Sequence, residues 1–228
     1  MTDAFVLSGG VGHDFEDSTA SLLELIGPAE VVVEPAELAR LSEREWPLLV
    51  VNALWWRMGA EHYAELRDEW ARELDSAARA GIDAHVAAGR PVLGIHTAAI
   101  CFDDFAGWGD VLGGSWQWGA SSHPPLDEVE PVPITVQRGV GSELIDGLDD
   151  FDVIDEVYGF MSVAADVEPL LTGRHGGVDH PLLWARTLPS GSRVVYDALG
   201  HDRRSLDHPT HREILRRSLA WLAARQRA

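Results

Sequence analysis

Polar side chains that can carry chemistry follow several of the short apolar segments that predict strands. His13 follows the first of these segments, His96 a central one and His201 the last, while Asp155 and Glu156 stand near the end of another. In an open α/β sheet the carboxyl ends of the parallel strands meet at one edge, where ligands collect. Three imidazoles and a carboxylate at such an edge can exchange protons as general acids and bases, or bind a divalent metal through nitrogen and oxygen.

No short-range ligand motif accompanies these residues, since the sequence has neither His-Glu-x-x-His nor Cys-x-x-Cys. A metal site therefore depends on convergence in the folded chain, with His13, His96 and His201 as ligands if a divalent metal such as zinc is the cofactor. Without a metal, the catalytic set of His96, Glu156, His201 and His13 would act by proton transfer. Each also has a structural alternative, as a helix cap, a bonded core residue, an exposed strand residue or a turn cap. Solvation or capping explains six of the ten histidines: His62, His85, His175, His180, His208 and His211.

Residues 94–98 have the form of the tight strand-to-helix turn on which many α/β enzymes place a nucleophile, but the apex residue is His96. Cys101 lies five residues further on, and we expect it to be a small packed core residue. An amidase or peptidase that used Cys101 would need its thiol to face the pocket with a lowered pKa. Residues 10–15 lack the third glycine of a dinucleotide loop, and no Gly-x-x-x-x-Gly-Lys occurs, so nucleotide binding has little support.

Short β-branched segments alternate with helical patterns in the first two-thirds of the chain, which predicts a parallel sheet wrapped by crossover helices. Strands are predicted at 4–7, 30–33, 48–52 and 91–95, and helices up to about 26, over 35–41, and from 63 as one long amphipathic helix that Gly89 ends. Residues 107–125 have no period and predict a long ordered loop. Short strands, several of them antiparallel, are predicted at 133–137, 151–157, 169–171, 182–186 and 193–198, before a closing helix with Asp207 as its cap.

Tryptophan is unusually frequent, with nine residues against three tyrosines. Five of the nine fall in segments next to the expected site: Trp55 and Trp56 after the third strand, and Trp108, Trp116 and Trp118 in the irregular segment. Indole rings suit the C–H faces of sugars, whose hydroxyls need carboxylate and amide partners. Trp55 and Trp116 are therefore candidate stacking surfaces, and Asn52 a candidate orienting group, although packing of a loop onto the sheet explains the tryptophans equally well.

Composition describes an acidic globular protein. The 228 residues are 46% hydrophobic and 24% charged, and 18 basic against 37 acidic side chains give a formal charge of −19. This charge repels nucleic acids and anionic lipids, and it favours a neutral polyol or a cation as ligand. The longest apolar stretch, 47–56, is too short to cross a bilayer, which takes about 20 residues. The start of the chain lacks a signal-peptide pattern and there is a single cysteine, so we expect a cytoplasmic protein, one domain over 1–228, with self-association into a homo-oligomer left open.

Several short motifs occur in an order that resembles the trehalose-utilisation (ThuA-like) family. They span nearly the whole chain: Gly9-Gly10-x-Gly-His13, Gly94-Ile95-His96-Thr97-Ala98, Leu112-Gly113-Gly114-Ser115-Trp116 followed by His123-Pro124, Asp155-Glu156-x-Tyr158, Pro181-Leu182-x-Trp184, and Leu199-Gly200-His201-Asp202. The resemblance implies a class I glutamine amidotransferase-like, flavodoxin-like fold. This is a three-layer α/β fold, with a parallel-core sheet flanked by helices and added antiparallel strands in the last third.

The same resemblance implies that the amidotransferase Cys-His-Glu triad is lost, because His96 stands where those enzymes carry cysteine. The protein is then not a glutamine amidotransferase. The family is associated with the metabolism of trehalose and related disaccharides, often alongside sugar oxidoreductases. Its polar motif positions correspond to His13, His96, His123, Glu156, Tyr158 and His201, which adds His123 and Tyr158 to the candidate substrate-binding residues.

Two functional hypotheses follow from these residues. The first is an enzyme of carbohydrate metabolism, a hydrolase, lyase or isomerase that acts on a disaccharide or oxidised sugar at a His/Glu site. The alternative is a non-catalytic sugar-binding or regulatory module on a degenerate amidotransferase-like fold. A structure distinguishes them in part, because the enzyme requires His13, His96, Glu156 and His201 to surround a common point, whereas wide separation favours the module.

Overall fold

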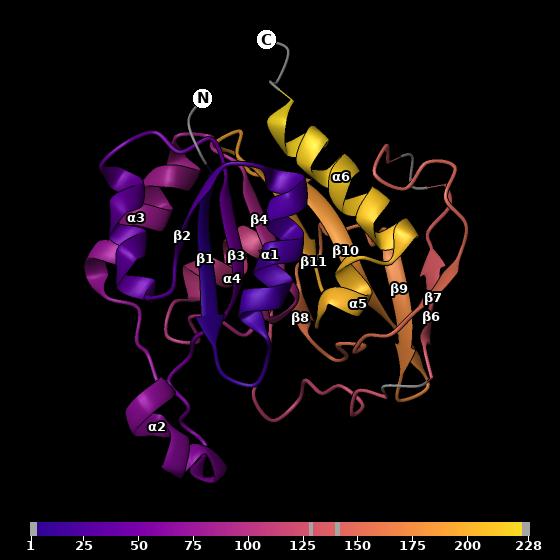
Figure 1. Cartoon of the computed structure of the whole chain (residues 1–228), viewed down its shortest axis with the longest axis horizontal. Helices are drawn as coiled ribbons and strands as arrows, with labels where there is room; N and C mark the ends of the chain where they lie inside the picture. Colours follow the sequence, from indigo (N-terminus) through magenta and orange to yellow (C-terminus); the bar gives the residue numbers. More distant parts are fainter. Residues whose placement is uncertain (1–3, 128–129, 140–141, 225–228) are drawn as a thin grey trace.

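A computed structural model describes residues 4–127, 130–139 and 142–224, so Met1–Asp3, part of the chain start used to judge a leader, lie outside the described residues (Figure 1). Within that part of the chain, nine strands form one sheet in the order β2-β1-β3-β4-β11-β10-β9-β6-β7. The parallel half contains β2 (Ala29–Val32), β1 (Ala4–Gly10), β3 (Leu49–Leu54), β4 (Val92–Ile95) and β11 (Arg193–Asp197). The antiparallel half contains β10 (Val178–Thr187), β9 (Leu171–His175), β6 (Val132–Val136) and β7 (Phe151–Val153). The predicted parallel core with antiparallel additions in the last third is confirmed.

Helices cover the sheet. α1 (Phe15–Ile26), α5 (Arg203–Leu206) and α6 (Pro209–Ala223) lie together in front of the strands in Figure 1, and α4 (Ala106–Leu112) lies behind them. η1 (Pro35–Ser42) packs closely on α3 (Ser76–Ala87), since a Cβ on Gly81 would stand 2.1 Å from the Leu38 carbonyl oxygen. Every residue of the central strands β3 and β4 is buried, as apolar strands between two helical layers must be.

The prediction of one continuous helix from residue 63 is wrong. The chain instead forms η2 (Glu61–Tyr63) and α2 (Ala64–Trp70), leaves helical geometry at Ala71 with ψ 134°, and restarts as α3. The restart follows from Asp75, whose carboxylate accepts from the Ala78 N–H at 2.8 Å and caps α3. α2 buries none of its residues and projects from the body of the molecule on the side to which β1 points (Figure 1). Hydrophobic periodicity identified the helical residues but not the non-helical segment between α2 and the N-cap of α3.

Three further predictions are corrected. Residues 107–125 are not wholly irregular, because α4 occupies the start and Gly113, at φ 80°, ends it before the two-residue strand β5 (Gly114–Ser115), which pairs with β8 (Ser162–Val163). The strand predicted at 151–157 ends at Val153, and Asp155 and Glu156 lie in the loop that follows. Asp207, expected to cap the last helix, instead accepts a hydrogen bond from the Ser21 hydroxyl at 2.6 Å.

Among the described residues, none of the helices has both the length and the apolar content that a membrane crossing demands.

A fully buried ion pair attaches α6 to the sheet. His211 Nε2 lies 3.0 Å from a carboxylate oxygen of Asp197 at the end of β11, and both side chains are completely inaccessible. His211 Nδ1 lies 2.8 Å from the Ser205 carbonyl oxygen. Burial opposes the charged imidazole, but the Asp197 carboxylate raises the pKa of His211 above its ordinary value of 6.5. The assignment of His211 to capping or solvation is therefore corrected: it is a core residue.

We predict that His211→Leu lowers the free energy of unfolding by about 3–5 kcal/mol near pH 6, because it leaves the Asp197 carboxylate buried without its partner. A His pKa raised by folding gives stability that is present below the unfolded pKa of 6.5 and is lost as pH rises through the folded value. Urea unfolding at about pH 6 to 9 should therefore show the gap between wild type and variant narrowing with pH. The exposed His62→Leu is the control, and a gap independent of pH would contradict the account.

Candidate functional site

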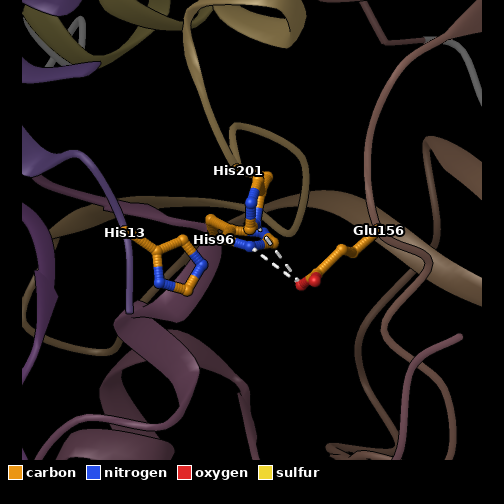
Figure 2. Close-up of side chains that lie close together, drawn as sticks. All are labelled: His13, His96, Glu156 and His201. Carbon is orange, nitrogen blue, oxygen red and sulfur yellow. Dashed lines mark ion pairs between the residues drawn. The ribbon is translucent and has the colours of Figure 1, made fainter. Parts of the chain in front are cut away.

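Four side chains from distant parts of the sequence converge at the carboxyl edge of the parallel strands. One potential ligand atom from each of His13, His96, Glu156 and His201 lies within 4.8 Å of every other (Figure 2). His13 follows β1, His96 follows β4, and His201 follows β11, so three loops at the same edge of the parallel half supply the imidazoles. Glu156 comes from the loop after β7, at the far edge of the antiparallel half. The predicted convergence of these four residues is what the structure shows.

His96 occupies the tight turn between β4 and the short helix η3 (His96–Ala99), as the sequence predicted. Its φ of 47° lies in the left-handed region, which costs a non-glycine residue about 1–2 kcal/mol. The ring is held at Nδ1, which lies 2.6 Å from the Ala198 carbonyl oxygen and therefore donates its proton there. Nε2 is left to face the site, 3.4 Å from a Glu156 carboxylate oxygen and 3.1 Å from the Tyr158 hydroxyl.

His201 depends on the glycine that precedes it. Gly200 has φ 113°, and a Cβ there would stand 2.8 Å from Ile95 Cγ2, so a larger residue would push the loop away from β4. The turn brings the His201 ring to 4.4 Å from the His13 ring, between centroids. His201 Nδ1 lies 3.6 Å from the nearer Glu156 oxygen, which is an ion-pair distance but too long for a good hydrogen bond.

The protonation of the cluster follows from its burial and charges. Burial, together with the neighbouring imidazoles of His96 and His201, lowers the pKa of His13 to about 3, so its ring is neutral. Burial opposes ionisation of Glu156, yet the adjacent His201 and His96 hold its pKa well below the ordinary value. Burial likewise opposes a charge on His96, but Glu156 and Asp155 raise its pKa. The site is thus an ionised carboxylate beside a neutral His13 and a His96 whose pKa is raised.

This arrangement fits a divalent metal. Both ring nitrogens of His13, and Nδ1 of His201, are buried without a hydrogen-bond partner among the described residues. An unpartnered buried polar atom costs about 1–3 kcal/mol, which a bound cation would offset. In a tetrahedral zinc site with bonds of about 2.0–2.2 Å the ligand atoms stand about 3.3–3.6 Å apart, so the ligand atoms of the four side chains, which lie within 4.8 Å of one another, would close in by about an ångström on binding. Three imidazoles and one carboxylate are donors that zinc and similar ions accept.

Asp155 positions two of the four residues. Its Oδ1 accepts from the Glu156 N–H at 2.7 Å, and its Oδ2 accepts from the Gly200 N–H at 2.7 Å and from the Ser205 hydroxyl. The Ser205 hydroxyl lies 3.0 Å from His211 Nδ1, so the bonds continue into the buried ion pair beneath α6. Sequence analysis noted Asp155 beside Glu156 but missed Ser205 and His211. No local pattern marks those two, because their contacts depend on how α5 and α6 fold back onto β11.

The other predicted site residues divide into two groups. His123 and Tyr158 adjoin the cluster: His123 Nδ1 lies 3.2 Å from the second Glu156 oxygen, and its side chain is 36% exposed. Tyr158 is buried, and burial with the nearby Glu156 charge raises its pKa well above the ordinary value, so the hydroxyl stays protonated. Trp116 packs against Tyr158 at 5.2 Å between ring centroids.

Asn52 and Trp55 do not join the cluster. The Asn52 amide, 1% exposed, donates to the hydroxyls of Ser18 and Thr19 on α1, both at 3.0 Å. Trp55 is 4% exposed, and its indole N–H donates to the Ser8 carbonyl oxygen at 3.3 Å, so it packs in the core. Asn52 lies within β3 and is bonded to α1, whereas Trp55 follows β3 and packs against the backbone of β1, so neither faces the cluster and we leave both out of the proposed site.

Cys101 is a packed core residue, as expected from the sequence. Its thiol donates to the Ala53 carbonyl oxygen at 3.0 Å, and burial raises its pKa to about 12. The condition set for an amidase or peptidase that uses this thiol, an accessible group with a lowered pKa, is not met.

Solved structures with similar folds support this description. A protein assigned as ThuA-like from Parabacteroides merdae has a TM-score of 0.74 at 15% identity, covering 98% of this chain and 91% of its own. A second from Bacteroides uniformis has a TM-score of 0.69 at 15% identity, with 99% and 92% covered. A protein assigned to GMP synthase from Thermoplasma acidophilum has a TM-score of 0.56 at 15% identity, with 98% and 94% covered. No curated protein matches the chain.

Fold and turn together define a class I glutamine amidotransferase-like α/β protein that carries histidine at the strand-to-helix turn. The chain belongs to the ThuA family, described as trehalose utilisation, whose family model matches residues 4–222. The family resemblance seen in the sequence motifs is thereby confirmed.

We predict that Asp155→Asn weakens zinc binding by about 10–100-fold, because residues that orient metal ligands have effects of that size. The substitution replaces one of the two carboxylate oxygens with an NH2 donor, so the side chain can no longer accept both from the Glu156 N–H at one end and from the Gly200 N–H and the Ser205 hydroxyl at the other. The measurement is a competition titration of zinc against a chelator. The exposed Asp152→Asn, three residues earlier, is the matched control. Equal zinc affinity in the two variants would show that Asp155 does not position the ligands.

Proposed function

We propose that this protein is an enzyme of carbohydrate metabolism that acts on a disaccharide or oxidised sugar at a metal-assisted His/Glu site. The observation that carries the proposal is the convergence of three imidazoles and one carboxylate within 4.8 Å, with His13 nitrogens that have no partner among the described residues. Membership of a family described as trehalose utilisation supports a carbohydrate substrate. The formal charge of −19 supports a neutral ligand, and we propose a cytoplasmic enzyme with neither nucleic acid nor membrane as partner.

His13, His96, Glu156 and His201 would hold the cation. A bound divalent ion would polarise an oxygen atom of the sugar and stabilise negative charge that develops on it. The Nδ1 hydrogen bond to Ala198 fixes the tautomer of His96, so its Nε2 lone pair is directed into the site. Glu156 supplies the compensating negative charge and takes contacts from His96, His123 and His201.

Tyr158 and His123 are the residues best placed to handle protons. The Tyr158 hydroxyl stays protonated and can donate a hydrogen bond to a substrate oxygen next to the cluster. His123 contacts the Glu156 oxygen that does not face His96, and its partly exposed ring can exchange protons with solvent. Acid/base catalysis by positioned side chains of this kind contributes about 10²–10⁴-fold to rate.

The first test is metal content. We expect wild-type protein, purified without a metal-affinity column, to bind one divalent ion per chain by elemental analysis and zinc titration. His96→Ala and Glu156→Gln should each lose most of this metal, because each removes a ligand from a set of four. His62→Ala removes an exposed histidine and should leave the content unchanged. If wild type binds as little metal as the ligand variants, the metal site is refuted.

The second test is turnover. Trehalose, and trehalose in which one ring hydroxyl has been oxidised to a ketone, are incubated with zinc-loaded protein and followed by NMR. We expect one of these sugars to be converted by wild type, and the rate to fall by about 10³-fold or more in Glu156→Gln. Conversion that persists in both Glu156→Gln and His96→Ala would contradict this site. Binding of sugar with no conversion would support the non-catalytic module instead.

A further inference from the structure

A row of aromatic side chains leads away from the candidate site. It begins at Tyr158, whose ring lies 4.4 Å from the His96 ring between centroids. Trp116 packs edge-on against Tyr158 at 5.2 Å, and Trp118 follows Trp116 at 6.4 Å. Trp118 lies 6.0 Å from Trp56 with ring planes 21° apart. Ring contacts therefore connect the candidate site to Trp118.

Trp118 is the outer member of this row and is 45% exposed. Tryptophans that serve only to pack this protein are buried, as Trp108 at 1% and Trp184 at 0% illustrate. The ring of Trp118 is kept in place by Trp56 and by Tyr63, whose ring lies edge-on at 6.3 Å. A large apolar ring that is fixed and yet open to solvent has the properties of a ligand contact.

A cavity of about 610 Å³ adjoins the two loop tryptophans. Its walls include Trp116 and Trp118 together with the polar side chains of Asp103, Ser115 and Gln117. The volume is within the range of about 300–1,000 Å³ found for small-molecule sites. Flat indole faces beside carboxylate, hydroxyl and amide groups match a sugar ring, which has apolar C–H faces and a rim of hydroxyls.

The charges around the cavity favour a neutral ligand. Two charged residues of the wall are engaged in ion pairs: Asp103 with Arg57 at 3.2 Å and Arg186 with Asp166 at 2.9 Å. Asp110 adds a negative charge to the wall, which would repel a phosphate or carboxylate group. An uncharged ring that offers hydroxyl donors to these carboxylates has no such penalty.

We infer that Trp116 and Trp118 bind a second, neutral sugar ring of the substrate, while the reacting ring lies at the His13–His96–Glu156–His201 cluster. The inference rests on the proposed function, which makes the substrate a carbohydrate. It specifies a glycoside of two rings rather than a free monosaccharide. It also assigns Trp118 a role in specificity, away from the reacting atoms.

The test compares two-ring and one-ring sugars. Trehalose, trehalose that carries one ring ketone, and glucose are titrated into zinc-loaded protein by calorimetry. We expect wild type to bind a two-ring sugar on the order of tenfold more tightly than glucose. Trp118→Ala should lose most of this advantage and leave glucose affinity unchanged, and Trp118→Tyr should recover most of it because it keeps an aromatic face. Phe160→Ala, which removes a ring that is 43% exposed but outside the row, should change neither affinity.

The outcomes separate this inference from the proposed function. Unchanged two-ring affinity in Trp118→Ala, or wild type that binds glucose as tightly as the two-ring sugars, overturns the second-ring site while a carbohydrate enzyme still stands. Wild type that binds none of the three sugars overturns the carbohydrate assignment itself. An equal loss of glucose and two-ring affinity in Trp118→Ala indicates a general structural effect, and it also overturns the second-ring site.

Discussion

The candidate site depends on the hydrogen bonds that the Asp155 carboxylate accepts. The three histidines belong to loops of the parallel half of the sheet, but Glu156 follows β7 at the edge of the antiparallel half. Asp155 bridges this distance, because it accepts hydrogen bonds from the backbone of Glu156 and of Gly200 with the same carboxyl group. Through Ser205 and His211 the constraint extends to Asp197 and α6. A buried polar network of this kind stabilises the fold only when every member has its hydrogen-bond partners. The position of the site residues and the stability of the protein are therefore coupled.

The same arrangement explains how an acidic protein maintains a site rich in imidazole. The molecule carries a formal charge of −19, yet the cluster contains one carboxylate among three histidines. Burial keeps His13 neutral, and the contacts of Glu156 with His96 and His201 keep that carboxylate ionised. The acidity of the whole protein therefore does not determine the protonation of the cluster, which is set by desolvation and by charged partners within a few ångströms. The backbone strain at His96 is consistent with a residue held in place by its surroundings.

Sequence predicted the strands of the parallel half and the convergence of four residues, because both follow from local pattern and from a general property of open sheets. The break before α3 was missed, since hydrophobic period does not register a capping residue such as Asp75. Asn52 and Trp55 were assigned to the site because they stand at the end of a predicted strand, but Asn52 is bonded to α1 and Trp55 to the backbone of β1, and only the folded chain supplies these contacts. His211 had the appearance of a helix-surface histidine because its partner, Asp197, is brought to it by tertiary packing.

The separation of the four cluster residues along the chain has a consequence for assembly. His13 follows the first strand and His201 the last, so the site exists only after the β-strands of both halves have paired and the final helices have docked. An ion held by this set would act as a crosslink between the two ends of the fold, and its tight retention would be a property of finished molecules alone. The fraction of molecules that retain the metal would therefore report the fraction that is fully folded, without any measurement of catalysis.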